Sequence, residues 1–280
     1  MFKNGKIIAF MNMKGGVAKT TLCINIAYTL SQQGKSVLVI DMDPQFNATQ
    51  TLTTKYKKDY RKLKEEKKTI YHLFEDPEDI VPDYVFGDEE LHEDELDLIT
   101  ELDNNLHMIC GDLELIKFEN ESGKRNRLNT YIEEKKLKEK YDYIFIDSPP
   151  TYSFYSVASI LASDCYILPI KPDYYSILGI DLVRYILKKV RKDYGKFLTE
   201  VGVITFIKNN TVVHDPIIEK LSKKVSYIFT EQLKEAVDVV RGSGQGILMY
   251  DSTPTIRSNI QRLTNELLKR MEEIYGESNK

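Results

Sequence analysis

The sequence predicts an α/β protein built on a doubly wound, mostly parallel twisted sheet with helices on both faces. Short apolar runs, rich in β-branched residues, recur along the chain and are typical of buried parallel strands. Helical patterns lie between several of these runs, and a strand followed by a helix, repeated, indicates a doubly wound sheet. The runs lie at 6–11, 36–41, 106–110, 143–147, 165–170 and 201–207.

The first helical pattern covers residues 20–33. Its apolar residues recur at helical spacing, so they share one face that can be buried against the sheet. Gly34 follows at the position just after the C-cap, where glycine commonly ends a helix. The apolar face consists of Leu22, Cys23, Ile26, Ala27 and Leu30.

Bulk composition limits the class of protein. The 280 residues could form two small domains, although α/β proteins of this size often form one, and length alone does not decide between them. With 39 basic against 43 acidic residues the formal charge is −4. Any affinity for DNA or anionic lipid must therefore come from a local patch. The N-terminal apolar run is too short for a signal peptide and no run of roughly 18 apolar residues exists, so a soluble cytoplasmic protein is expected. Cys23, Cys110 and Cys165 are isolated in apolar runs and predict buried free thiols.

Residues 52–104 interrupt the alternation of strands and helices. A lysine-rich stretch opens this segment, and 75–103 then carries many carboxylates with no lysine or arginine. We predict a charged helical insertion at about 52–104 with solvated faces. A surface that docks a partner is the alternative interpretation.

A loop rich in glycine and lysine follows the strand at 6–11 and leads straight into the helix. Glycines allow the backbone to wrap around an anion, amide groups converge on it, and the helix N-terminus adds a positive dipole end. This context predicts a polyphosphate site. Lys19 would contact the β and γ phosphates, Thr20 would give its hydroxyl to Mg²⁺, and Thr21 would reach the α phosphate. The loop consists of Lys14, Gly15, Gly16, Val17, Ala18, Lys19, Thr20 and Thr21.

The loop departs from the usual consensus, because Met13 and Ala18 stand where that consensus has its two glycines. With a second lysine, Lys14, ahead of Lys19, it resembles the deviant Walker A group of P-loop NTPases: ParA-type partition ATPases, MinD and the nitrogenase iron proteins. The resemblance implies one ATPase domain over 1–280 that uses ATP and Mg²⁺. It also implies a homodimer that forms on ATP binding, in which Lys14 reaches the partner's phosphates.

Two further strand ends match this group in order. The segment 37–49 resembles a strand followed by D-x-D-P-Q-x-N-A-T, and Asp43 matches the residue that orients the attacking water or holds Mg²⁺ through water. Asp41 is either a direct participant or a carboxylate that caps and hydrogen-bonds. The segment 141–150 resembles Walker B, whose carboxylate, Asp147, would hold Mg²⁺ through its water shell. The catalytic candidates are Lys14, Lys19 and Asp43, and the metal candidates are Thr20, Asp43 and Asp147.

The resemblance extends along nearly the whole chain outside 52–104. Residues 106–116 and 157–180 are similar to later segments of the family, although Cys110 replaces the usual proline. The loop that follows the strand at 201–207 lies where the family approaches adenine. Asn209 is the candidate for that contact, and a simple turn asparagine is the alternative.

Two other members of the group, and one alternative from another class, make different predictions. An iron protein would need two cluster cysteines in loops, and the cysteines here do not suit. A MinD-like membrane-positioning ATPase would end in a basic amphipathic helix; here the stripe of Ile260, Leu263, Leu267, Met271 and Ile274 borders a face of mixed charge, which favours packing on its own domain. A P-loop small-molecule kinase or ligase would need an acceptor pocket that sequence does not reveal.

We favour the ParA-type interpretation. It implies a slow switch ATPase on the nucleoid, with non-specific DNA binding by the ATP dimer, a centromere-binding adaptor protein that stimulates hydrolysis, and no stable membrane association. The chain begins directly at the first strand, so we expect the short type without an N-terminal DNA-binding extension. Candidate DNA contacts are Lys188, Lys189, Arg191, Lys192, Lys223, Lys224, Arg241, Arg257 and Arg262.

Overall fold

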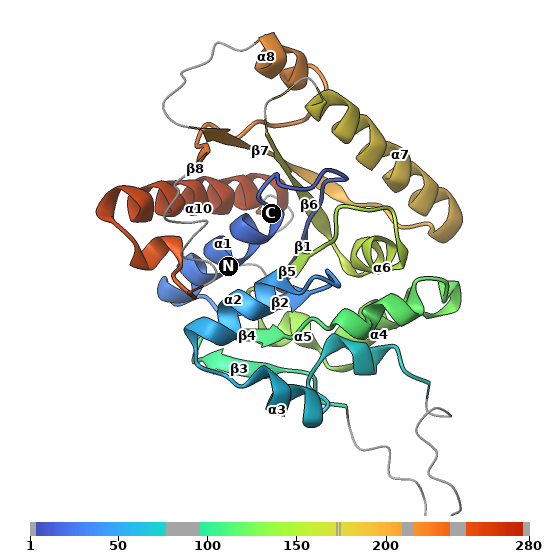
Figure 1. Ribbon diagram of the computed structural model, residues 1–280. Coiled ribbons are helices and arrows are strands. Elements are labelled where there is room, and N and C mark those ends of the chain that lie inside the picture. The colour runs from blue at the N-terminus through green and yellow to red at the C-terminus, as the bar shows by residue number, and fades with distance from the viewer. Residues whose placement is uncertain are drawn as a thin grey trace, which may run out of the picture.

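The computed structural model describes residues 4–76, 96–171, 173, 175–208, 216–235 and 245–276. Within these residues eight strands form one sheet in the order β3-β4-β2-β5-β1-β6-β7-β8, and neighbouring strands are parallel except β3 with β4 (Figure 1). All of the predicted strands are present. The strands are β1 (Lys6–Phe10), β2 (Val37–Asp41), β3 (Thr100–Asp103), β4 (Leu106–Ile109), β5 (Tyr143–Asp147), β6 (Cys165–Ile170), β7 (Thr199–Lys208) and β8 (Leu233–Glu235).

Helices cover both faces of this sheet, which confirms the predicted doubly wound α/β class. Along β1, Ile8 and Phe10 join the cluster around α1, whereas Ile7 and Ala9 join clusters around α6 on the other face. Side chains of a strand alternate between faces, so the sequence of a strand that is covered on both sides is a continuous apolar run. The helices are α1 (Lys19–Gln32), α2 (Asn47–Lys55), α3 (Tyr60–Glu65), α4 (Arg127–Glu134), α5 (Leu137–Lys140), α6 (Phe154–Ala162), α7 (Ser176–Tyr194), α8 (Pro216–Ser222) and α10 (Pro254–Tyr275).

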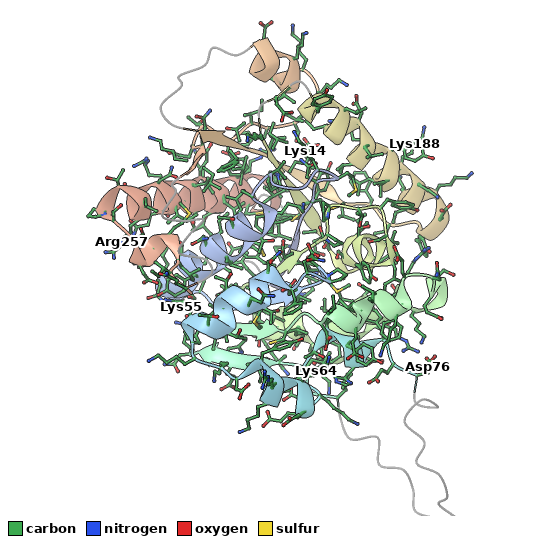
Figure 2. All side chains as sticks on the ribbon, viewed as in Figure 1. Lys14, Lys55, Lys64, Asp76, Lys188 and Arg257 are labelled. Atoms are coloured by element: carbon green, nitrogen blue, oxygen red, sulfur yellow. The ribbon has the colours of Figure 1, made fainter. Side chains whose placement is uncertain are left out.

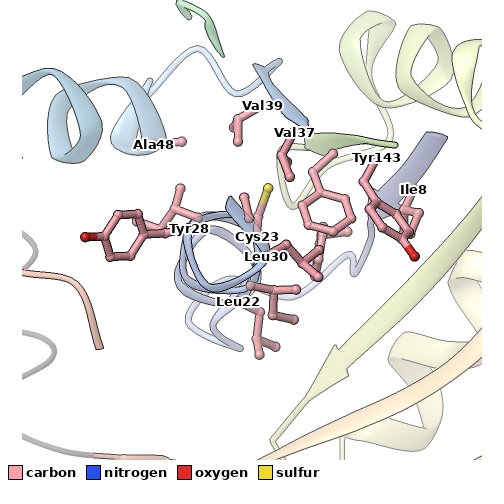
Figure 3. Packing of buried hydrophobic residues seen from close by; sticks show 14 of the residues in the cluster. Ile8, Leu22, Cys23, Tyr28, Leu30, Val37, Val39, Ala48 and Tyr143 are labelled. Atoms are coloured by element: carbon pink, nitrogen blue, oxygen red, sulfur yellow. The ribbon is translucent and has the colours of Figure 1, made fainter. Parts of the chain in front are cut away.

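Helix α1 is the centre of one layer (Figure 3). Its predicted apolar face is fully buried, and the Cys23 side chain points from the helix toward Val37 of β2. Gly34 has a φ of 79° directly after the C-cap Gln33, as the sequence predicts. The free thiols of Cys23, Cys110 and Cys165 are all buried.

Helix α10 packs against α1, and its apolar stripe faces inward. Ile260, Leu263, Leu267 and Met271 are buried in the α1 cluster, with Ile274 partly buried beside them. The predicted packing of this helix on its own protein is therefore observed. Among the helices of the described residues, none has the length and apolar content that crossing a bilayer requires.

The segment 52–104 is only partly helical where it is described. It holds the end of α2, then α3 and the short helix η1 (Ile70–Leu73), and residues 77–95 lie outside the described residues. Its last residues form β3, an edge strand antiparallel to β4, which corrects the prediction of a helical insertion at that end. The side chains of β3 alternate between buried and less buried, the pattern of a strand. The assignment of 1–280 to one domain stays a prediction.

Candidate functional site

The predicted phosphate and metal residues follow three neighbouring strands. β5 lies between β1 and β2, so that Asp147 at its end pairs in register with Phe10 on one side and Asp41 on the other. The loop after β1 carries the glycines and lysines, and the loop after β2 carries Asp43. Because these strands are parallel, their carboxyl ends meet at one edge of the sheet, where α/β proteins bind ligands.

The phosphate loop turns sharply before α1. Gly16 and Ala18 both take left-handed conformations, with φ of 70° and 68°, and Ala18 is the N-cap of the helix. A Cβ added to Gly15 or Gly16 would meet no protein atom within 4 Å, so the protein leaves open space beside this backbone. The first turn of α1 contains no acidic residue. Open backbone at a positive helix end fits a bound phosphate group.

Asn12 fixes the start of this loop, a role that the sequence analysis missed. Its Nδ2 donates to the carbonyl oxygen of Pro169 at 2.7 Å, and its Oδ1 accepts from the Lys14 amide at 3.0 Å. A Cβ on Gly179 would lie 3.2 Å from that Oδ1, so α7 approaches closely here. The available clue in the sequence was a polar residue directly after an apolar strand.

Lys19 is the buried cation of the site. Its side chain is 7% exposed, and its Nζ donates to the Lys14 carbonyl oxygen at 3.3 Å. Burial lowers the pKa of Lys19, while the nearby carboxylates of Asp147 and Asp43 act in the opposite direction. The structure therefore brings Lys19, Asp43 and Asp147 into one electrostatic cluster, as predicted for a site that binds phosphates.

Asp147 is fully buried, and within the described residues neither of its carboxylate oxygens has a hydrogen-bond partner. Burial raises the pKa of Asp147 well above its usual range and the charge of Asp41 adds to this rise, whereas Thr20 and Lys19 oppose it. A buried carboxylate without partners is costly. Its oxygens fit the hydrated Mg²⁺ that the sequence assigns to Asp147 and Thr20, because oxygen is the ligand that Mg²⁺ prefers.

Asp41 and Asp43 have different environments. Asp41 accepts hydrogen bonds on Oδ2 from the amide and hydroxyl of Thr49, both at 2.8 Å, and on Oδ1 from the Asp43 amide at 3.2 Å. Burial raises its pKa to about 7. These contacts favour the hydrogen-bonding interpretation of Asp41, which shapes the loop at 43–49. Asp43 is 8% exposed, and its Oδ1 accepts from the Gln45 amide at 2.9 Å.

Lys14 does not join this cluster. Its Nζ forms an ion pair with Asp173, and it lies 6.0 Å from the centroid of the Tyr175 ring, just before α7 (Figure 2). Both partners of the ion pair are about one third exposed. Sequence reasoning missed Asp173 because no local pattern links it to the phosphate loop. Asn209, the candidate for adenine, lies outside the described residues.

The fold and the phosphate loop at the strand ends define a P-loop NTPase. Residues 5–200 match the model of a family described as AAA domain. The sporulation initiation inhibitor protein Soj of Bacillus subtilis is 31% identical over 225 residues, which cover 78% of this chain and 79% of Soj. The chromosome partitioning protein ParA of Myxococcus xanthus is 27% identical over 274 residues, 95% of this chain and 89% of ParA. The chain belongs to the AAA domain family, among the ParA- and Soj-like partition ATPases.

Solved structures show the same fold. A plasmid partition protein of Borrelia burgdorferi bound to AMPPNP superposes with a TM-score of 0.69 at 24% identity, covering 96% of this chain and 99% of that chain. A cobyrinic acid a,c-diamide synthase of Mycobacterium smegmatis with ADP and magnesium also gives a TM-score of 0.69, at 18% identity, covering 97% and 96%. The fold is therefore common to proteins of different activities.

We predict that Lys19→Ala abolishes ATP binding, because the substitution removes the buried cation of the phosphate loop. Titration with a fluorescent ATP analogue measures this directly, and circular dichroism checks that the variant is folded. Lys57→Ala, at an exposed position, is the matched control and should bind like the wild type. Affinity retained by folded Lys19→Ala would show that the loop is wrongly assigned.

Proposed function

We propose that this protein is a Mg²⁺-dependent ATPase that forms a homodimer around ATP, binds DNA without sequence preference in that state, and drives plasmid or chromosome partition. DNA binding would place it on the nucleoid, and a centromere-binding adaptor protein would stimulate its slow hydrolysis. The observation that supports this most is the position of Lys14: it belongs to the phosphate loop, yet its side chain forms an ion pair with Asp173. Two of the proteins named above, the ParA of Myxococcus xanthus and the Borrelia burgdorferi structure, carry partition names.

Each residue of the site has a distinct role in this proposal. Lys19 and the amides of the loop bind the β and γ phosphates, and Thr20 with Asp147 hold Mg²⁺, which neutralises phosphate charge when bound. Asp43 orients the attacking water beside the γ phosphate. Lys14 completes the site of the other subunit.

The ion pair of Lys14 gives this proposal a physical basis. Among the residues that the structure describes, one carboxylate, that of Asp173, forms an ion pair with its ammonium. The phosphates of ATP carry more negative charge than one carboxylate and offer more acceptor oxygens, so contact with them competes well for a lysine. If Lys14 exchanged Asp173 for the phosphates bound by the other subunit, association of the two subunits would depend on ATP.

The alternatives receive less support. The stripe of α10 that a MinD-like protein would use at a membrane is buried against α1. A metabolite kinase or ligase shares this fold, as the diamide synthase shows, but the likeness is one of fold alone. The buried cysteines of the described chain lie on separate elements, which does not favour an iron–sulfur protein.

The basic residues suggested for DNA do not form one surface. Figure 2 places Lys188 on α7 and Arg257 at the start of α10, on opposite sides of the view. Lys223, Lys224 and Arg262 form ion pairs with Glu219, Asp181 and Glu231, and Arg241 lies outside the described residues. We assign DNA contact to the C-terminal half of α7, where basic residues are grouped: Lys188, Lys189, Arg191 and Lys192.

We predict that the ATP-bound dimer binds DNA of any sequence with an affinity that falls by at least about tenfold between roughly 50 and 200 mM salt, because phosphate contacts release counterions. Fluorescence anisotropy with duplexes of unrelated sequence measures this. Lys188→Glu with Lys192→Glu should weaken binding, and Arg257→Glu should leave it unchanged. Binding that ignores salt, or none with ATP, would contradict the partition proposal.

Lys14→Ala is expected to bind ATP as a monomer through Lys19 and the loop amides, but to fail to form the closed dimer. Analytical ultracentrifugation with ATP separates the two states, and nucleotide titration confirms binding. Lys35→Ala, outside the phosphate loop, serves as control and should dimerise. A Lys14→Ala protein that dimerises and hydrolyses ATP like the wild type would refute the role across the dimer.

Asp43→Ala should bind ATP, dimerise and hold DNA, while its hydrolysis falls by about 10²–10⁴, because the group that orients water is lost. Loss of its negative charge also relieves repulsion with the γ phosphate. Phosphate release under single turnover, together with sedimentation, provides the measurement. A monomeric Asp43→Ala protein, or one with normal turnover, would rule out this assignment.

A further inference from the structure

Phe46 adopts an unusual backbone conformation in the loop that carries Asp43. Its φ and ψ are both 40°, in the left-handed region that disfavours residues with a Cβ, and Phe46 is the N-cap of α2. Its ring stacks on Tyr60, the first residue of α3, with centroids 5.4 Å apart and planes at 11°. Such stacking stabilises the ring of Phe46 in this position.

The position of Phe46 is linked to that of Asp43 by hydrogen bonds. The Phe46 amide donates to the Asp43 carbonyl oxygen at 2.8 Å, and the Gln45 amide donates to the Asp43 carboxylate at 2.9 Å. The turn from Asp43 to Phe46 is therefore closed on itself. The backbone of Phe46 and the carboxylate of Asp43 therefore belong to one hydrogen-bonded turn.

Tyr60 is anchored on the loop after β4. Its hydroxyl donates to the Gly111 carbonyl oxygen at 3.1 Å, and the Gly111 amide donates to the Thr49 hydroxyl at 2.7 Å. A Cβ on Gly111 would lie 2.8 Å from the Phe46 Cβ and 2.9 Å from the Asp41 Cγ. The backbone at Gly111 thus lies close against the Cβ of Phe46, while Tyr60 covers the face of the Phe46 ring.

Helix α3 itself is held to the same loop. One turn after Tyr60, Lys64 forms ion pairs with Asp112 at 3.2 Å and Glu114 at 2.7 Å. Hydrogen bonds from Lys117 and then Lys64 lower the pKa of Glu114 to about 2. Tyr60 therefore projects from a helix that has a fixed place relative to the strand ends.

We propose that Tyr60 is a positioning residue for Asp43. Helix α3, which carries Tyr60 and lies in the segment 52–104, thereby sets the rate of ATP hydrolysis. The proposal rests on the proposed role of Asp43 in orienting water. Tyr60 acts through Phe46 and the closed turn. Both rings line a cavity of about 540 Å³ that also reaches Thr20 and Thr21, so a direct contact with nucleotide is the competing explanation to be tested.

Tyr60→Leu should lower kcat for ATP hydrolysis by at least about tenfold, since small displacements of a catalytic group are costly, while ATP affinity and dimerisation stay unchanged. Tyr60→Phe keeps the stack and should restore most of the rate. Tyr56→Leu is the matched control: Tyr56 also anchors this region, through its hydroxyl and Asp103 at 2.6 Å, but it does not stack on Phe46, and its kcat should match the wild type.

The cycle of Tyr60→Leu, Phe46→Leu and the double variant tests the route of the effect. Because both substitutions remove the same stack, the double variant should lose no more in kcat than either single variant. Normal kcat in folded Tyr60→Leu, a parallel loss of ATP affinity, or an equal loss in Tyr56→Leu would each overturn the positioning role. An Asp43→Ala protein that hydrolyses ATP as fast as the wild type would instead refute the proposed function itself.

Discussion

Burial of three carboxylates beside one lysine is the constraint on which this site depends. Asp41, Asp43 and Asp147 are all at most 8% exposed, and Lys19 is the buried cation on which the charges of Asp147 and Asp43 act. Like charges in a poorly solvated place repel and lose hydration, so each needs its own compensation. Asp41 accepts hydrogen bonds from Thr49 and Asp43 from an amide of its own turn, whereas Thr20 and Lys19 offset only part of the cost of burying Asp147, whose pKa stays raised. The hydrogen bonds that Asp41 and Asp43 accept determine the shape of the loop that follows β2.

The central strands and the phosphate loop could be predicted because their determinants are local. A buried parallel strand is a continuous apolar run, and the loop before α1 is a short motif with fixed spacing. The edge strands β3 and β8 escaped prediction because they have four and three residues and no apolar run. Asn12, Asp173 and Tyr60 escaped it for another reason. Their partners are far apart in sequence, as with Asn12 and Pro169 at 157 positions, and one sequence carries no record of such pairs.

Fold and function separate clearly in this protein. The same architecture serves a plasmid partition protein and a diamide synthase, so the sheet and its helices do not select the activity. The chemistry of this chain is concentrated at one edge of the sheet: a second lysine in the phosphate loop, a carboxylate in a closed turn, and a buried carboxylate without hydrogen bonds in the described residues.

The shortness of the edge strands also limits how two copies of this chain can associate. A long, exposed edge offers unpaired amides and carbonyls to a neighbouring sheet, and proteins commonly guard against such contact with short edges. In the described residues the sheet ends in β3 on one side and β8 on the other. As described, neither strand offers a long ladder of backbone hydrogen bonds, which disfavours a continuous sheet across two subunits. The proposed homodimer would therefore use loops and helices, surfaces whose shape a bound ligand can alter.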